Sequence, residues 1–139
     1  MSEESTTPDL VERVRGFWAS AARRDWPKIL RFYAPDAVWD MSPMGLGTYE
    51  DEAAMRGLWQ DWVAAYDELH LDVEALDLGH GVVFAVVGQN ARPIGSTGRV
   101  HARQALVYCW VEGMVVRVTV YSDIDEGRVA AERLAKERG

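Results

Sequence analysis

Few residues in this sequence could carry out acid–base, nucleophilic or metal chemistry. The three histidines, His70, His80 and His101, are scattered, and the single cysteine, Cys109, falls within an expected strand. Metal ions and activated thiols need several such groups close together. We therefore predict no metal ion and no cofactor, and a buried structural role for Cys109.

One carboxylate, Asp40, lies where it could act as a general base. It sits between Trp39 and Met41 in a stretch that alternates like a strand. A period of two turns Trp39 and Met41 toward one face, and Asp40 with Val38 toward the other. Asp40 is therefore a weak candidate for a catalytic base. The alternative is that it is a surface or strand-end carboxylate without a catalytic role. Whether the chain is an enzyme stays open.

Large apolar side chains are more prominent than reactive ones. The chain has six tryptophans and five tyrosines among 139 residues. Met55, Leu58, Trp59, Trp62 and Tyr66 recur at helical spacing, which predicts a helix from about residue 51. These rings either fill a core or line a pocket.

Charge and composition exclude several kinds of partner. The formal net charge is −7, whereas nucleic acids and anionic membranes require clustered Lys and Arg. No apolar run approaches the roughly 20 residues of a membrane helix. We predict a disordered lead-in over residues 1–7, a single domain over 8–137, a cytoplasmic location and a mostly apolar ligand.

The remaining elements follow from periodicity and turn residues. Thr7-Pro8-Asp9 predicts a helix start, and Pro35 predicts a turn over residues 34–37 after a short helix that reaches Tyr33. The expected elements are helices over residues 8–24, with Thr7 as cap, 25–33 and 51–66, strands over 38–42, 69–78, 82–91, 99–111 and 114–121, and a last helix over 126–136. Helices first and antiparallel strands afterwards indicate an α+β fold.

Several motifs carry a resemblance to a known family. They are residues 32–39 (FYAPDAVW), the helix over 51–66, the Glu112-Gly113 turn and Tyr121-Ser122-Asp123. In this order they resemble the SnoaL-like group of the nuclear-transport-factor-2-like superfamily, which includes polyketide cyclases and ketosteroid isomerases. The resemblance implies a curved, mostly antiparallel, mixed sheet wrapped around three N-terminal helices, a cone-shaped cavity, a short C-terminal helix and a homodimer.

The catalytic residues of ketosteroid isomerases do not carry over. Their positions fall on Phe17, Met41 and Leu106, which cannot exchange a proton, and only a one-residue slip brings in Asp40. One hypothesis is that the chain binds a small, mostly apolar molecule, with or without transforming it. A second is that it is a non-catalytic interaction module whose aromatic side chains only fill the core. A third reading is an isomerase, cyclase or epoxide hydrolase with Asp40 as general base.

The expected pocket residues follow from one strand. If Trp110 faces inward, a period of two puts Gln104 and Tyr108 on the same side, and the family match puts Gln89 opposite them. We predict these two glutamines and this tyrosine as the main polar groups of the pocket. The predicted ligand-binding residues are Phe17, Tyr33, Trp39, Met41, Trp59, Trp62, Gln89, Gln104, Leu106, Tyr108 and Trp110.

The same strand motivates the predicted assembly. Its second half is apolar on both faces, with Ala105 and Val107 on the outer one. Helices are expected to cover only the inner face, so a second subunit should cover the outer one. We therefore predict a homodimer through the outer face of the sheet.

Overall fold

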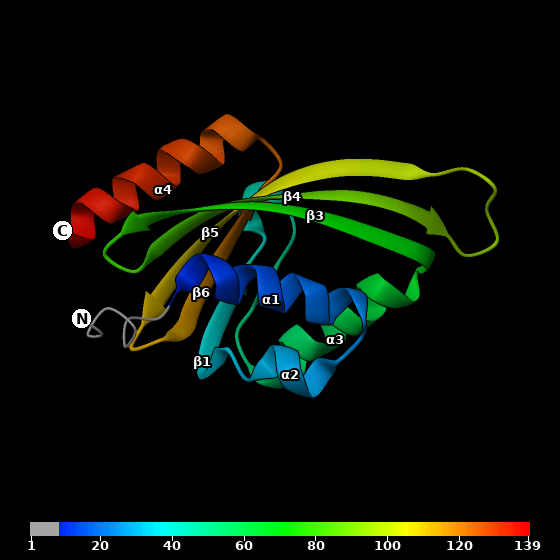
Figure 1. Ribbon diagram of the computed structural model, residues 1–139, viewed down its shortest axis with the longest axis horizontal. Helices are drawn as coiled ribbons and strands as arrows, with labels where there is room; N and C mark the ends of the chain where they lie inside the picture. The colour runs from blue at the N-terminus through cyan, green and yellow to red at the C-terminus, as the bar shows by residue number, and fades with distance from the viewer. Residues whose placement is uncertain (1–8) are drawn as a thin grey trace, which may run out of the picture.

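The computed structural model describes residues 9–139, which are built around one open, curved sheet of six strands (Figure 1). The strand order is β2-β1-β6-β5-β4-β3; β1 pairs in parallel with β6, and the other neighbours are antiparallel. The elements are α1 (Leu10–Ala22), α2 (Trp26–Leu30), β1 (Tyr33–Asp40), the short 3-10 helix η2 (Ser42–Met44), β2 (Thr48–Tyr49), α3 (Glu52–Ala64), β3 (Tyr66–Gly79), β4 (Val82–Pro93), β5 (Val100–Val111), β6 (Met114–Tyr121) and α4 (Ile124–Arg138). The α+β prediction, with three helices before a mixed sheet and a helix after it, is confirmed.

The helices lie on both faces of the sheet. α1, α2 and α3 are on one side of it, called here the inner face, and α4 crosses the other (Figure 1). Leu106, Tyr108 and Trp110 of β5 pack inward with Val83 and Val87 of β4. Among the described residues, no helix combines the length and apolar character needed to span a membrane.

α4 covers the outer face of β5, which corrects one step of the assembly prediction. Ala105 and Val107 are buried there in a second cluster with Ala131 and Ala135 of the helix. A Cβ on Gly127 would lie 2.6 Å from the Cβ of Ala105, so the glycine permits this close approach. The expectation that helices cover only one face was wrong, and these apolar residues need no second subunit.

Aspartates begin three of the helices. The carboxylates of Asp9, Asp51 and Asp123 each accept a hydrogen bond from the backbone N–H three residues later. These bonds satisfy donors that have no partner within the helix. The cap of α1 is thus Asp9 and not Thr7, which lies outside the described residues, as does the predicted lead-in over 1–7. The single domain over 8–137 stays a prediction.

Two boundaries differ from the sequence prediction. The second helix ends at Leu30, and β1 begins at Tyr33 where a turn was expected. Its pairing with β6 shifts register between Tyr33 and Val38, and such an irregular stretch accommodates Pro35, which has no N–H to donate. Tyr66, expected on the third helix, instead opens β3.

Candidate functional site

A cavity of about 100 Å³ lies between the inner face of the sheet and the helices α1 and α3. Four tryptophans from three different elements form most of its wall. The lining residues are Trp18, Trp39, Met41, Leu58, Trp59, Trp62, Gln104 and Val120. Because α1, β1, α3, β5 and β6 all contribute, the cavity exists only in the folded domain.

Ring-to-ring contacts hold the tryptophans in place. The centroids of Trp39 and Trp59 are 5.5 Å apart at an interplanar angle of 81°, and those of Trp18 and Trp62 are 6.0 Å apart at 85°. Edge-to-face contacts of this kind each add about 0.5–1.5 kcal/mol beyond apolar burial. The wall is therefore rigid on the tryptophan side.

The polar groups of the cavity are neutral. The amide Nε2 of Gln104 lies 3.9 Å from the sulfur of Met44, which is a weak acceptor. The Nε1 atoms of Trp39 and Trp59 are buried, and within the described part of the chain they have no hydrogen-bond partner. None of the eight lining side chains is charged.

The structure brings together only part of the predicted site. Trp39, Met41, Trp59, Trp62 and Gln104 line the cavity. The other predicted residues do not line it: Phe17, Tyr33, Leu106, Tyr108 and Trp110 are buried in the core, and Gln89 is half-buried on β4 and lines a separate groove. Ligand contact by any of the eleven stays a prediction.

Tyr108 is hydrogen-bonded within the inner layer. Its hydroxyl accepts a 2.9 Å hydrogen bond from Nε1 of Trp18, and it does not line the cavity. Burial raises the pKa of Tyr108, and the Trp18 hydrogen bond offsets only part of that rise. Burial, reinforced by Tyr108, also raises the pKa of Tyr33. Both phenols therefore stay protonated.

Three lining residues were not predicted as ligand contacts: Trp18, Leu58 and Val120. Trp18 neighbours Phe17 on the broad apolar stripe of α1, and Leu58 is on the stripe of α3. Val120 alternates with Val118 along β6. Helical periodicity indicates Trp18 and Leu58 as apolar positions of their helices, but it does not separate wall from core.

Asp40 forms an ionic cluster away from the cavity. Its carboxylate accepts hydrogen bonds from the Ser42 N–H at 2.9 Å, the Thr48 hydroxyl at 3.3 Å and the Arg117 guanidinium at 2.5 Å. Burial alone would raise the pKa of Asp40, but the Ser42 and Arg117 contacts together lower it below its ordinary value. An ionised, fully paired carboxylate is a weak general base.

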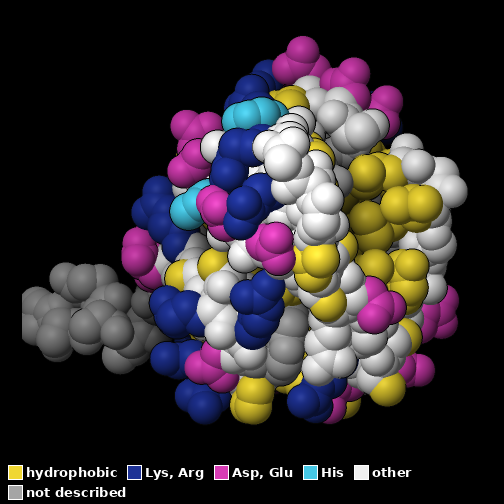
Figure 2. Space-filling view, turned by 90° about the vertical axis from the view of Figure 1, so that its right-hand side faces the viewer, with side chains coloured by type: hydrophobic (Ala, Val, Ile, Leu, Met, Phe, Trp, Pro, Cys, Tyr) yellow, Lys and Arg dark blue, Asp and Glu magenta, His cyan; other side chains and the backbone are white. Residues whose placement is uncertain are grey.

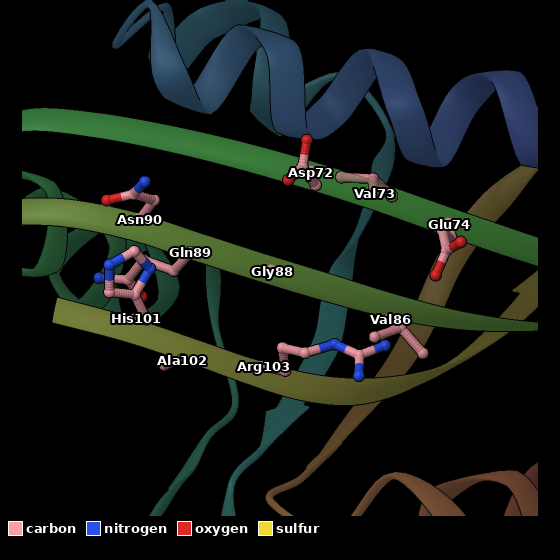
Figure 3. A pocket seen from close by; sticks show the side chains of 10 residues that line it. All are labelled: Asp72, Val73, Glu74, Val86, Gly88, Gln89, Asn90, His101, Ala102 and Arg103. Carbon is pink, nitrogen blue, oxygen red and sulfur yellow. The ribbon is translucent and has the colours of Figure 1, made fainter.

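A broader groove of about 900 Å³ crosses the outer face of β3, β4 and β5 (Figure 3). Asp72 and Glu74 stand along β3, and His101 and Arg103 along β5, with Gly88 of β4 between the two rows. All four charged or titratable side chains are exposed, and within residues 9–139 none of them forms an ion pair. Figure 2 shows basic and histidine side chains grouped on one side of that view and hydrophobic ones on the other.

A metal site requires several ligand side chains close together. Within the described range, no three His, Cys, Asp or Glu side chains gather closely enough to hold a metal ion. Cys109 is free, and its neighbour is the guanidinium of Arg138 at the end of α4. The predicted lack of metal and cofactor remains a prediction.

A curved mixed sheet, with helices and an apolar cavity on its inner side, defines the cone-shaped class of α+β domains. Within that class, the chain belongs to the SnoaL-like domain family, whose family model matches residues 14–118. No curated protein matches the sequence significantly.

Solved structures of similar fold agree with this assignment. A nuclear-transport-factor-2-like protein of unknown function from Burkholderia pseudomallei is 21% identical and has a TM-score of 0.70 over 90% of this chain and 98% of that chain. TerC, co-crystallised with polyporic acid, is 19% identical with a TM-score of 0.69 over 91% and 97%. A protein of ketosteroid isomerase-like fold from Catenulispora acidiphila, in complex with trimethylamine, is 13% identical with a TM-score of 0.69 over 90% and 94%. At these identities the likeness establishes the fold alone.

Proposed function

We propose that this domain binds a small, mostly apolar molecule in the tryptophan-lined cavity. The observation that carries the proposal is the cavity itself, which lies between the inner face of the sheet and the helices α1 and α3. Small-molecule sites are concave and apolar, with a few polar groups that set the orientation of the ligand. Gln104 supplies such a group in a wall formed by Trp39, Trp59 and Trp62.

The size of the cavity limits what can enter. A cavity of about 100 Å³ is smaller than the engineered one of about 150 Å³ that binds benzene. It therefore encloses one end of a ligand, unless a wall moves. Met41 and Met44 are half-buried at this end, and their unbranched side chains adapt readily to different shapes. Two solved neighbours, one co-crystallised with polyporic acid and one in complex with trimethylamine, support small-molecule binding by this fold.

Binding is favoured over the two alternatives. An isomerase, cyclase or epoxide hydrolase based on Asp40 requires that carboxylate to accept a proton in the cavity, yet it is paired with Arg117 on the other face of β1. A purely structural role for the aromatics leaves the cavity and the unpartnered indoles without an explanation. We retain binding as the proposal and attach no reaction to it.

A thermal-unfolding screen tests this function, because a ligand that binds only the folded state raises Tm by mass action. Steroids, terpenoids, aromatic polyketides and small aryl ketones form the panel. We expect at least one to stabilise the wild type, and to stabilise Val120→Leu less, since the added methylene occupies the cavity. Val118→Leu is the matched control, because Val118 lies on the same strand and does not line the cavity. Stabilisation of both variants alike would contradict the proposal.

We also propose a homodimer through the outer groove. With Ala105 and Val107 covered by α4, the support is electrostatic: an acidic row on β3 faces outward beside a basic row on β5. A two-fold axis that runs along the groove, parallel to the strands, places the acidic row of one copy opposite the basic row of the other. The interface is therefore self-complementary in charge.

Charge reversal tests this assembly. Glu74→Arg or Arg103→Glu alone should lower the mass measured by light scattering from dimer to monomer, because like charges then face each other. The double variant restores complementarity and should restore the dimer. A mass unchanged in both single variants would exclude this interface.

A cytoplasmic location completes the proposal. Cys109 is free and half-buried, as a cysteine of a reducing compartment would be. Fractionation of the native host, with detection of the intact chain, tests the location directly.

A further inference from the structure

The tryptophan-lined cavity has one end that is buried and another that is close to solvent. We propose that its ligand is a neutral amphiphile, which binds with its apolar end innermost and its polar group beside Gln104. This inference rests on the proposed function, since it names the class and the orientation of the molecule bound at the same site.

Burial divides the wall of the cavity into two groups of residues. In the buried group no residue is more than 6% exposed, and its members are Trp18, Trp39, Trp59 and Val120. The half-buried group is Met41, Leu58, Trp62 and Gln104. Solvent is in contact with the second group, so we place the entrance to the cavity on that side.

Gln104 lies at the open end of the sheet's inner face. Along β5, Tyr108 and Leu106 are each 1% exposed, whereas Gln104 is half-buried. The pairing of β5 with β6 ends at Ala105, so Gln104 is one residue outside the paired region. There its amide Nε2 lies 3.9 Å from the sulfur of Met44 in η2. The amide is therefore at the entrance and not at the buried end.

The buried group offers no free side-chain hydrogen-bonding atom. The Nε1 atoms of Trp39 and Trp59 are enclosed by protein, and that of Trp18 donates to the hydroxyl of Tyr108. The side chain of Val120 has only carbon. A polar ligand group at this end would lose its hydration without gaining a partner, which is unfavourable. The apolar end of the ligand therefore belongs here.

The half-buried group supplies one neutral polar side chain. Gln104 can both donate and accept, and its present contact with Met44 is weak because a thioether is a poor acceptor. A hydroxyl, ketone or amide of the ligand can replace that contact. A carboxylate or an ammonium group finds no counter-charge among the eight lining side chains. A neutral polar group at the entrance is therefore favoured over an ionised one.

A series of six-carbon probes tests the class of ligand on the wild-type protein. 1-Hexanol has one neutral polar end, 1,6-hexanediol has two, and hexanoate and hexylammonium each carry a charge. Dissociation constants come from tryptophan fluorescence and are checked by ligand-observed NMR. We expect 1-hexanol to bind about tenfold more tightly than each of the other three. The diol has to bury a second hydroxyl, and the ions have no counter-charge in the wall.

Intermolecular NOEs between 1-hexanol and the protein measure the orientation directly. We expect contacts from the terminal methyl group to the rings of Trp39 and Trp59. The methylene group next to the hydroxyl should contact the side-chain amide of Gln104. The reverse pattern of NOEs would overturn this inference and leave the proposed function intact.

Two variants assign the polar contact to one amide. Gln104→Leu should weaken the binding of 1-hexanol several fold. Gln60→Leu is the matched control, because Gln60 is half-buried on α3 and does not line the cavity, so the affinity should stay the same. Circular dichroism checks that both variants are folded, and the wild-type measurements stand if one is not. An unchanged affinity in folded Gln104→Leu would overturn the inference.

The remaining outcomes separate this inference from the proposed function. Tightest binding of hexanoate, hexylammonium or the diol would overturn the neutral amphiphile. No binding of any six-carbon probe at its solubility limit, together with a ligand from the thermal-unfolding screen, would overturn this inference alone. Failure of both the probes and the screen would contradict both proposals.

Discussion

The indole Nε1 of Trp18 donates a 2.9 Å hydrogen bond to the hydroxyl of Tyr108, 90 residues away in the sequence. Trp18 lines the cavity from α1, and Tyr108 is buried on β5. The bond therefore joins the helical layer to the sheet at the base of the cavity. Trp18 therefore has a hydrogen-bond acceptor for its indole N–H, whereas Trp39 and Trp59 have none among the described residues.

Tyr108→Phe should destabilise the protein. The change removes the acceptor and leaves the buried Trp18 N–H unpaired, which costs about 1–3 kcal/mol. Urea unfolding measures the loss. In a double-mutant cycle with Trp18→Phe, the two losses should be less than additive because both remove the same bond. Strict additivity would contradict the contact.

Gly127→Ala should destabilise the packing of α4 on the sheet. The added Cβ would meet the Cβ of Ala105 at 2.6 Å, and overpacking of this kind costs about 1–3 kcal/mol. Gly57→Ala on α3 is the control, because its Cβ would have nothing within 4 Å and alanine favours a helix. Thermal unfolding should move the two variants in opposite directions. A stabilised Gly127→Ala protein would show that α4 does not lie so close.

Asp40→Asn should remove part of the acid sensitivity of the fold. The pKa of Asp40 is lowered in the folded state, so its contribution to stability is present above its unfolded pKa of about 4 and is lost as the pH falls through the folded value. The variant should lose about 1–3 kcal/mol at pH 7 and have a flatter stability profile below pH 5. Asp36→Asn, an exposed change on the same strand, should leave the profile as it is. Identical profiles for Asp40→Asn and the wild type would contradict the ionic cluster.

Gln104→Leu should separate stability from binding. Gln104 is half-buried and makes only a weak contact with Met44, so leucine should leave the free energy of unfolding unchanged or raise it. Affinity for a ligand found in the thermal-unfolding screen should fall several fold, because a polar group that helps orient it is lost. Chemical denaturation and fluorescence titration measure the two quantities. Unchanged affinity would remove Gln104 from the site.

Most of the architecture could be predicted from periodicity and turn residues. The switch from a helical repeat at Trp59 and Trp62 to alternation from Leu71 onward located the change from helices to sheet. The inward direction of Gln104 followed from alternation along one strand and is what the structure shows. The predicted start of β1 was less accurate, because Pro35 was assigned to a turn. In the structure β1 already begins at Tyr33, and its irregular pairing with β6 accommodates the proline.

The site could be predicted only in part, because cavity and core share one apolar pattern. Phe17 and Trp18 are neighbours on α1 and both are buried, yet of the two only Trp18 lines the cavity. The pairing of Asp40 with Arg117 joins strands far apart in the sequence, so no local signal indicates it. The contact between α4 and Val107 was also not predicted, because the apolar stripe of that helix is weak and gives little indication of the face it buries.

The most direct test of binding in the cavity is an NMR titration that follows the indole Nε1–H signals of ¹⁵N-labelled protein. With a ligand that stabilises the wild type in the thermal-unfolding screen, we predict concentration-dependent shifts for Trp18, Trp39, Trp59 and Trp62, which line the cavity. The signal of Trp110, which is buried outside the wall, should stay in place. Shifts confined to Trp110, or no shift of any cavity tryptophan at saturating probe, would contradict a ligand site here.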